Sequence, residues 1–265
     1  MKDNILGEIL TSGTIKNEYK AKDDQYFKDL EVIIKSRQFT LRDILTAYPS
    51  FIRRRDMPRM LAYYELYKLI QYMPGSIVDL GIFRGAGFFN WINLLETFAP
   101  GDRMRKVYGF DHFMGFQNFT DSKDSGKDWL EENNENGLLA NADYELIESL
   151  LALHNGDSFF PGVERGKLIE GDVLETIPEF ALNNLGTRLS LIYFDINMYE
   201  PTKVALDNLY DLLLPGGVIA FNGWGSLPWE GEAKAFEEFI AERGLKVKIK
   251  KFDFSTMPRG YFIKD

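Results

Sequence analysis

The sequence predicts an α/β fold: a doubly wound, mostly parallel sheet with helices on both faces and an antiparallel strand from a C-terminal hairpin. Short apolar runs rich in β-branched residues alternate along the chain with stretches of helical apolar spacing, which is typical of strand–helix–strand units. Glycine and proline separate these stretches, as at Pro74-Gly75 and Pro215-Gly216. The last two β-rich runs are separated only by residues 255–259, which is short enough for a hairpin.

Five buried parallel strands are expected from runs that are nearly continuous in apolar residues. They cover residues 76–81, 106–111, 167–171, 189–195 and 218–221. Helices are expected where apolar residues recur at three- and four-residue intervals. These cover residues 60–72, 88–98, 204–214 and 232–243. The closing hairpin would pair residues 245–254 with 260–263.

Two regions lie outside this alternation. Residues 1–57 are polar with short apolar clusters and are expected to form a helical N-terminal extension, which leaves residues 58–265 as the main domain. Residues 118–161 are rich in Asp, Asn, Ser and Glu, include Trp129, and hold one helical stretch at 144–153. Long excursions inside an α/β fold are usually functional or disordered. We interpret this segment as a lid or specificity insert over the carboxyl edge of the sheet.

Composition excludes several classes of site and partner. The chain has no cysteine, which rules out disulfides, cysteine-based zinc or iron–sulfur sites and a cysteine nucleophile. His112 and His154 are the only histidines, which argues against a multi-histidine metal site. With 31 Lys plus Arg against 40 Asp plus Glu, the net charge of −9 argues against nucleic acid as a partner. No leader-like or membrane-spanning apolar run is visible, so we expect no membrane association and a cytoplasmic protein.

Ligands of open α/β sheets bind outside the carboxyl ends of the strands, so residues there are the first candidates for a binding site. The first strand runs into a turn that holds Asp79, Gly81, Gly85 and Gly87. Glycine lets a ligand approach the main chain closely. The spacing G-x-x-x-G-x-G differs from the G-x-G-x-x-G of dinucleotide oxidoreductases, which disfavours a nicotinamide-dependent enzyme. A tight strand–helix turn without a ligand explains the pattern equally well.

Two further acids stand at neighbouring strand ends. Asp111 ends the second strand, where a carboxylate can accept two hydrogen bonds from ribose hydroxyls. Asp172 follows the third strand, at a position where its carboxylate could contact the amino group of adenine. Either acid alone is explained as a helix N-cap. Together with Asp79 beside a glycine turn, they favour a ligand that contains adenosine.

Five segments give the chain a resemblance to class I S-adenosyl-L-methionine-dependent methyltransferases. More narrowly, it resembles the macrocin O-methyltransferase family, which methylates sugar hydroxyls of macrolides and related natural products. The segments lie within about residues 58–242 and read IVDLGIFRG (77–85), VYGFDHF (107–113), GDVLETIP (171–178), FDINMYEPT (194–202) and LPGG (214–217).

The resemblance implies a Rossmann-like methyltransferase sheet over residues 58–265 and S-adenosyl-L-methionine as the cofactor. It also implies a role for each matching residue. Asp79, Gly81 and Gly85 would line the methionine end, Asp111 would bind the ribose, and Asp172 with its neighbour Val173 would hold the adenine.

The chain departs from the family pattern where that pattern supplies a divalent metal. The pattern is Asp-x-Asp after the fourth strand and Asp-Asp after the fifth, whereas this chain has Asp195-Ile196-Asn197 and Asn222-Gly223. Magnesium binds chiefly through carboxylates, with water completing an octahedron. One carboxylate with amides makes a weak site. We therefore predict no tightly held metal and an altered way of activating the acceptor.

Asp195 is the first candidate for a catalytic base, because it stands at the strand end beside the switch in strand order. His112 is the second, since histidine ordinarily titrates near neutrality, and a surface or capping histidine is the alternative. His154, inside the insert, is a weaker candidate. Trp224 and Trp229 could wall an acceptor pocket, or they could be ordinary buried rings.

These observations predict a methyltransferase that acts by in-line transfer to the oxygen, or the nitrogen, of a small-molecule acceptor such as a sugar or natural-product intermediate. The alternative is a non-catalytic protein that binds S-adenosylmethionine or S-adenosylhomocysteine and has lost its metal positions together with its activity. The helical N-terminus could support a homodimer, although nothing in the sequence specifies one.

Overall fold

The computed structural model describes residues 13–117, 119–133, 143–160 and 162–265. The chain divides into two compact units, Met1–Met57 and Pro58–Asp265. The larger unit contains the sheet and all the predicted site residues, and the smaller unit is helical.

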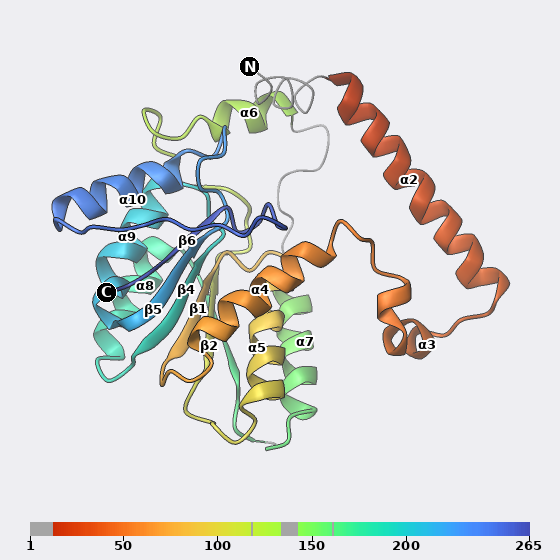
Figure 1. Cartoon of the computed structure of the whole chain (residues 1–265), viewed down its shortest axis with the longest axis horizontal. Coiled ribbons are helices and arrows are strands. Elements are labelled where there is room, and N and C mark those ends of the chain that lie inside the picture. Colours follow the sequence, from red (N-terminus) through yellow and green to blue (C-terminus); the bar gives the residue numbers. More distant parts are fainter. Residues whose placement is uncertain (1–12, 118, 134–142, 161) are drawn as a thin grey trace. The chain divides into compact units, whose positions relative to one another are not determined.

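A six-stranded sheet forms the centre of the larger unit (Figure 1). The strands lie in the order β3-β2-β1-β4-β5-β6, in which the first five are parallel and β6 is antiparallel to β5. They are β1 (Ser76–Leu80), β2 (Val107–Asp111), β3 (Gly166–Glu170), β4 (Leu189–Phe194), β5 (Leu213–Phe221) and β6 (Gly260–Ile263). The strand order reverses between β1 and β4. The predicted doubly wound, mostly parallel α/β fold is confirmed.

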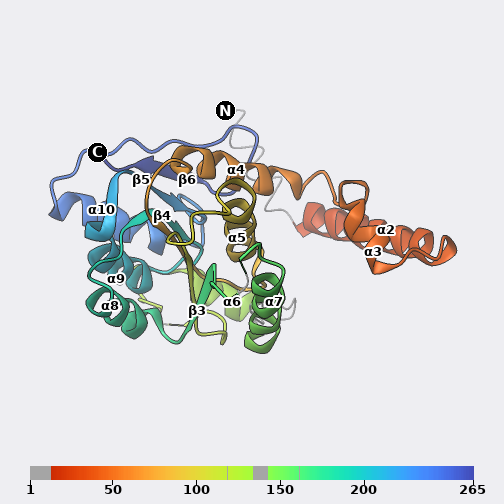
Figure 2. The same ribbon diagram turned by 90° about the horizontal axis from the view of Figure 1, so that it is seen from below.

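Helices cover both faces of this sheet, with α4, α5 and α7 on one side and α8, α9 and α10 on the other (Figures 1 and 2). They are α4 (Met57–Ile70), α5 (Ala86–Phe98), α7 (Tyr144–Gly156), α8 (Val173–Asn183), α9 (Tyr199–Leu209) and α10 (Gly231–Glu242). Side chains along β1 point alternately to the two faces of the sheet, and this alternation explains the two helical layers. Ile77 packs in the cluster with α4 and α5, whereas Val78 and Leu80 pack in the cluster with α8, α9 and α10. Burial on both faces is why the strands are nearly continuous in apolar residues.

The fifth strand is longer than predicted, and the helix before it begins and ends five residues earlier than predicted. α9 ends at Leu209, a 3-10 turn follows at Tyr210–Leu212 (η3), and β5 begins at Leu213. Leu189 pairs with Leu213 but Leu191 pairs with Val218, so the register shifts across the Pro-Gly-Gly segment. The predicted helix end at residue 214 was wrong because this segment forms an irregularity inside a strand and does not stop a helix.

The C-terminal hairpin is only partly formed. β6 pairs with β5 in the predicted antiparallel sense. Residues 245–254 form no strand, and their backbone pairs with β6 at a single bridge between Lys250 and Tyr261. Ile249 next to this bridge packs on the core cluster beside α10. This segment is therefore held in place by side-chain packing on the core, and not by a continuous ladder of backbone hydrogen bonds.

The predicted insert divides into two parts. Its later part contains α7, the crossover helix between the parallel strands β2 and β3, which buries Ile147 and Leu151 in the core. Its earlier part contains α6 (Gly126–Asn133). Residues 118, 134–142 and 161 lie outside the described residues. α7 belongs to the helical layer of the sheet, so the lid interpretation is confined to residues 119–133 and stays a prediction.

The smaller unit contains α2 (Gly13–Ser36), α3 (Leu41–Thr46) and the 3-10 turn η1 (Tyr48–Ser50). Asp23 forms ion pairs with Arg53 and Arg55, so two of the three consecutive arginines at positions 53–55 are paired within the unit. None of the described side chains between residues 21 and 56 is buried. Across the described parts of the whole chain, no helix combines the length and the apolar character needed to cross a bilayer.

Candidate functional site

A cavity of about 450 Å³ lies at the carboxyl ends of β1, β2 and β4. This is the switch point of the sheet, where the strand order reverses and where open α/β sheets bind ligands. Its walls also include the start of α8, part of α6 and the loop before α10. Six of the eight predicted site residues line it, namely Gly81, Asp111, His112, Asp172, Val173 and Asp195.

The turn between β1 and α5 requires glycine at two points. Gly81 has φ +85° and Gly85 has φ +83°, a left-handed conformation that other residues disfavour. A Cβ on Gly81 would lie only 2.4 Å from the carbonyl oxygen of Asp195, so the ends of β1 and β4 touch through their main chains. Gly85 is the N-cap of α5 and does not line the cavity, which puts it outside its predicted role.

The Asp111 carboxylate ties this turn to the end of β2. Its Oδ2 accepts hydrogen bonds from the N–H groups of Ile82 and Phe83 at 2.8 and 2.9 Å, and its Oδ1 accepts one from Phe113 at 2.8 Å. Phe83 and Phe113 have φ of +52° and +58°, a conformation that costs each about 1–2 kcal/mol. The carboxylate thereby stabilises two strained residues. A carboxylate has about four lone-pair sites, so Asp111 retains acceptor capacity toward a ligand in the cavity.

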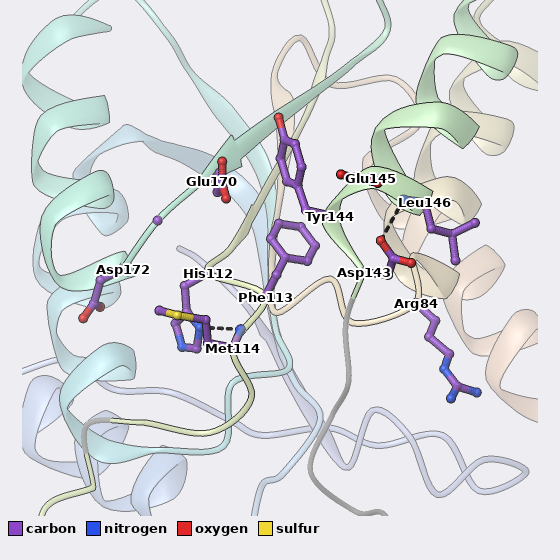
Figure 3. A pocket seen from close by; sticks show the side chains of 11 residues that line it. Arg84, His112, Phe113, Met114, Asp143, Tyr144, Glu145, Leu146, Glu170 and Asp172 are labelled. Atoms are coloured by element: carbon purple, nitrogen blue, oxygen red, sulfur yellow. Dashed lines mark hydrogen bonds between the residues drawn. The ribbon is translucent and has the colours of Figure 1, made fainter.

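His112 and Asp172 lie between the cavity and an open groove beside it (Figure 3). The Nδ1 of His112 accepts a hydrogen bond from the N–H of Met114 at 3.0 Å, which engages one of the two ring nitrogens. His112 lines the cavity, and its role as a base stays a prediction. Asp172 caps α8 by accepting from the N–H of Leu174 at 2.9 Å, and buried Val173 follows it in the wall.

Asp79 lies beneath the glycine turn and not in the cavity wall. Its side chain is buried, and a Cβ on Gly87 would lie 2.9 Å from its Oδ2 and 3.2 Å from the hydroxyl of Tyr63. Burial, and then the negative charge of Asp195, raises the pKa of Asp79 well above its ordinary value. Asp79 is therefore not among the residues that line the cavity, because its carboxyl faces the helices that cover the sheet, and its role at the methionine end of the cofactor stays a prediction.

Asp195 follows β4 and is held at both oxygens. Its Oδ2 accepts a hydrogen bond from Nη2 of Arg59 at 2.8 Å, and its Oδ1 accepts one from Nδ2 of Asn222 at 2.6 Å. The hydroxyl of Tyr193 donates to Oδ1 of Asn222 at 3.2 Å, which orients the amide. Burial raises the pKa of Asp195, and the contacts with Arg59 and Asn222 limit the rise. A carboxyl whose pKa is raised toward neutrality suits a general base.

Arg59 is a site residue that sequence reasoning missed. It lies on α4 and lines the cavity, and its Nε donates a hydrogen bond to the hydroxyl of Tyr63 at 2.9 Å. The two residues are four apart, which places them on the same face of the helix. No motif marks Arg59, because α4 reads in the sequence as an ordinary amphipathic helix before the first strand.

Glu232, on the first turn of α10, is a second acid that the sequence did not single out. It is fully buried, and its Oε2 accepts a hydrogen bond from the N–H of Gly223 at 2.6 Å. A Cβ on Gly223 would lie 2.8 Å from this oxygen and 2.4 Å from Oδ1 of Asn197. Glu232 and Asn197 thus fill the space that a side chain at position 223 would need. Burial, and then the charge of Asp195, raises the pKa of Glu232 well above its ordinary value.

One wall of the cavity is aromatic. Trp229 stacks on Phe116 with ring centroids 4.8 Å apart, and Trp129 of α6 meets Trp229 edge-on at 6.0 Å. All three side chains line the cavity. Trp224 packs against Phe236 and does not line it, so of the two tryptophans considered from the sequence only Trp229 is in a position to contact an acceptor.

His154 takes no part in the cavity. Its ring stacks on Phe89 with centroids 4.7 Å apart, on α7 and α5 respectively. Burial lowers its pKa, which favours the neutral ring. The structure therefore gives His154 a packing role.

The donors at the ends of β4 and β5 do not fit the metal site of the family pattern. Among the described residues, no group of three or more His, Asp or Glu side chains could hold a metal ion. Both oxygens of Asp195 are already engaged, with Arg59 and Asn222. A divalent ion on the remaining lone pairs of Asp195 would lie beside the positive charge of Arg59, which opposes its binding, so we derive no step of the chemistry through a metal.

Comparison with known proteins identifies relatives of this chain. The sequence profile of the macrocin-O-methyltransferase family (TylF) matches residues 47–259. The 8-demethyl-8-(2,3-dimethoxy-alpha-L-rhamnosyl)-tetracenomycin-C 4'-O-methyltransferase of Streptomyces olivaceus is 26% identical over 152 residues, which is 57% of this chain and 54% of that protein. The match thus spans about half the length of that relative.

Two solved structures share the fold over most of the chain. The calicheamicin methyltransferase CalS11 superimposes with a TM-score of 0.78 and 27% identity, covering 91% of this chain and 92% of that one. The apo structure of CalS11, described as a TDP-rhamnose 3'-O-methyltransferase, gives a TM-score of 0.73 and 24% identity, covering 91% and 94%. The similarity therefore extends beyond the part of the chain matched by the tetracenomycin relative.

Proposed function

The chain belongs to the macrocin-O-methyltransferase family, and from this premise we propose that it uses S-adenosyl-L-methionine to methylate a sugar hydroxyl of a small-molecule acceptor. The observation that carries the proposal is one cavity that is lined by the glycine turn and Asp111 together with Asp195 and the aromatic wall. The tetracenomycin relative is named for an acceptor that bears a rhamnosyl group, which supports a sugar acceptor.

The cavity fits a nucleoside-containing cofactor in size and lining. Its volume of about 450 Å³ is in the range of small-molecule sites. Gly81 lines the cavity, and its missing Cβ lets the ends of β1 and β4 meet there. We assign the ribose to Asp111 and the adenine to Asp172 and Val173. When bound, S-adenosyl-L-methionine supplies an electrophilic methyl group, whose C–S bond breaks with its electron pair left on sulfur as the acceptor oxygen forms the C–O bond.

Asp195 is the group that takes the proton of the acceptor hydroxyl in this proposal. Its two oxygens each use one lone pair, toward Arg59 and Asn222, so each retains a second. Its raised pKa brings it closer to the working pH of a base. Trp229 and Phe116 provide apolar ring faces against which a sugar can pack and from which water is excluded.

Calorimetry and a product assay test the proposal. Titration of the full chain with S-adenosylmethionine should show binding. Incubation with TDP-rhamnose and other nucleotide-linked deoxysugars should then yield S-adenosylhomocysteine and a methylated sugar, detected by mass spectrometry. The Asp195→Asn variant should keep cofactor binding and lose turnover.

Each other outcome has a defined meaning. Cofactor binding without turnover on any acceptor would favour the non-catalytic binding protein. Binding of NADH, with no binding of S-adenosylmethionine, would contradict both interpretations.

A further inference from the structure

Arg59 and Asp195 form an ion pair that faces the cavity. Nη2 of Arg59 lies 2.8 Å from Oδ2 of Asp195, and the two side chains are 35% and 22% exposed. Both residues line the cavity, so the pair is within reach of a bound acceptor. Tyr63 fixes the guanidinium from the other side, through its hydroxyl at 2.9 Å from Nε. The positive charge is therefore held in one place.

Arg59 is the only Lys or Arg among the described residues that line the cavity, against three aspartates. The other titratable groups that face Asp195 are acids or phenols, from α4, β1, β2, β4 and α10. They are Tyr63, Asp79, Asp111, Tyr193 and Glu232. Since like charges disfavour ionisation, Arg59 is the one charged neighbour on this side of the site that favours the Asp195 carboxylate.

The guanidinium remains charged in this environment. Burial by itself lowers the pKa of Arg59, but the neighbouring oxygens of Tyr63 and Asp195 outweigh that effect and raise it overall. An arginine is in any case protonated at all physiological pH values. The charge at Arg59 is therefore permanent, unlike that of a metal ion that must bind from solution.

We propose that Arg59 is a positioning residue whose guanidinium keeps Asp195 ionised and oriented toward the acceptor, so that methyl transfer by this chain needs no divalent cation. The inference rests on the proposed function. It explains how Asp195 can act in this chain, although Asn197, Asn222 and Gly223 occupy positions where a magnesium site would need further acids. A guanidinium pairs with a single carboxylate, whereas magnesium needs several oxygen ligands.

The competing explanation is an ion pair that only fastens α4 to the end of β4. The chain offers a matched pair of that kind, because Nη1 of Arg243 lies 2.7 Å from Oδ1 of Asp211, away from the cavity. A purely structural pair predicts that removing Arg59 lowers the free energy of unfolding and shifts the Asp195 pKa, as the loss of any close counter-charge does, but leaves the pH dependence of turnover unchanged. A positioning role predicts that the acid limb of the kcat/KM profile moves together with the ionisation of Asp195.

Carbon-13 NMR of the side-chain carboxyls in the full chain, with and without S-adenosylhomocysteine, measures the ionisation of Asp195 for this comparison. The Asp195 resonance is assigned by its absence in Asp195→Asn. In Arg59→Gln the titration midpoint of Asp195 should move to higher pH by about one unit or more, because an opposite charge at this distance lowers a carboxyl pKa by at least that much. Arg59→Lys, which keeps the charge, should move it less, and Arg243→Gln should not move it.

Magnesium provides the second readout. Millimolar magnesium chloride should leave the Asp195 resonance of the wild type unmoved, and a chelator should leave turnover unchanged for any acceptor that reacts. The acid limb of the kcat/KM profile of Arg59→Gln should move to higher pH, as the NMR midpoint does. An unmoved midpoint in both Arg59 variants, or a magnesium-dependent shift in the wild type, overturns the inference.

Calorimetry with S-adenosylhomocysteine on the same samples separates this test from that of the proposed function. If the wild type binds no S-adenosylhomocysteine, the methyltransferase proposal fails, while the effect of Arg59 on Asp195 is still measured without ligand. If it binds and the midpoint does not move, only the role of Arg59 fails.

Discussion

Replacing Asp111 with alanine removes the acceptor of three backbone N–H groups at once. Those groups belong to Ile82, Phe83 and Phe113, on the turn after β1 and the loop after β2. Two of these residues have positive φ, so the change also removes the contacts that hold them in a disfavoured conformation. The perturbation therefore acts on the shape of the cavity as well as on a ligand contact.

The magnitude follows from the burial of the three donors. A hydrogen bond to a charged group contributes about 1.5–3 kcal/mol. Ile82 is 3% exposed, so the loss of its bond counts in full, about 2 kcal/mol. Phe83 is 43% exposed and Phe113 is part-buried, so water replaces part of their bonds and each loss is about 0.5 kcal/mol. We expect the free energy of unfolding to fall by about 3 kcal/mol, and the affinity for S-adenosylhomocysteine to fall at least about 100-fold, or about 2.8 kcal/mol.

Urea denaturation and calorimetry with S-adenosylhomocysteine measure the two effects. Asp111→Asn should be intermediate, because its amide oxygen can still accept from the turn while its NH₂ group opposes the N–H of Phe113. Leu209→Ala, in the core away from the cavity, should cost about 2–5 kcal/mol of stability and leave the affinity unchanged. A folded Asp111→Ala protein whose affinity stays within about threefold of the wild type would refute the reasoning.

Three further outcomes are expected. Gly81→Ala should lower the free energy of unfolding by about 2–4 kcal/mol in urea melts and abolish binding of S-adenosylhomocysteine, because its Cβ would lie 2.4 Å from a carbonyl oxygen at φ +85°; Gly101→Ala, with open space around it, should be neutral, and equal effects of the two would contradict this. The pKa of Glu232 is raised by burial, so the folded state keeps a proton that the unfolded state releases above about pH 4, and stability falls as pH rises. Glu232→Gln should therefore be more stable relative to the wild type at pH 8 than at pH 5 in urea melts, and a constant difference would count against a neutral buried carboxyl. Trp229→Ala should raise the KM for the acceptor about tenfold without changing the affinity for S-adenosylhomocysteine, and a fall in that affinity would place Trp229 at the cofactor instead.

The sheet and its ligand-facing edge were predictable because their signals are local. A buried parallel strand needs a run of apolar residues, and the turn after β1 needs glycine where φ is positive, so both features are legible within a few residues. Parallel strands place their carboxyl ends at one edge, so the strand pattern alone predicts that Asp111, Asp172 and Asp195 lie together. The Pro-Gly-Gly segment before Val218 misled the prediction, because the same residues that end a helix can also produce an irregularity within a strand.

The sequence by itself thus determined which runs are buried, where the chain turns, and which acids end neighbouring strands. Only the tertiary structure decided which side chains meet. Arg59 and Asp195 are 136 positions apart, and their contact depends on how α4 rotates as it packs on the sheet. The same packing turns Asp79 away from the cavity and brings Glu232 into the space beside Gly223. Such contacts arise from the collective packing of whole faces, and no short stretch of sequence carries a signal for them.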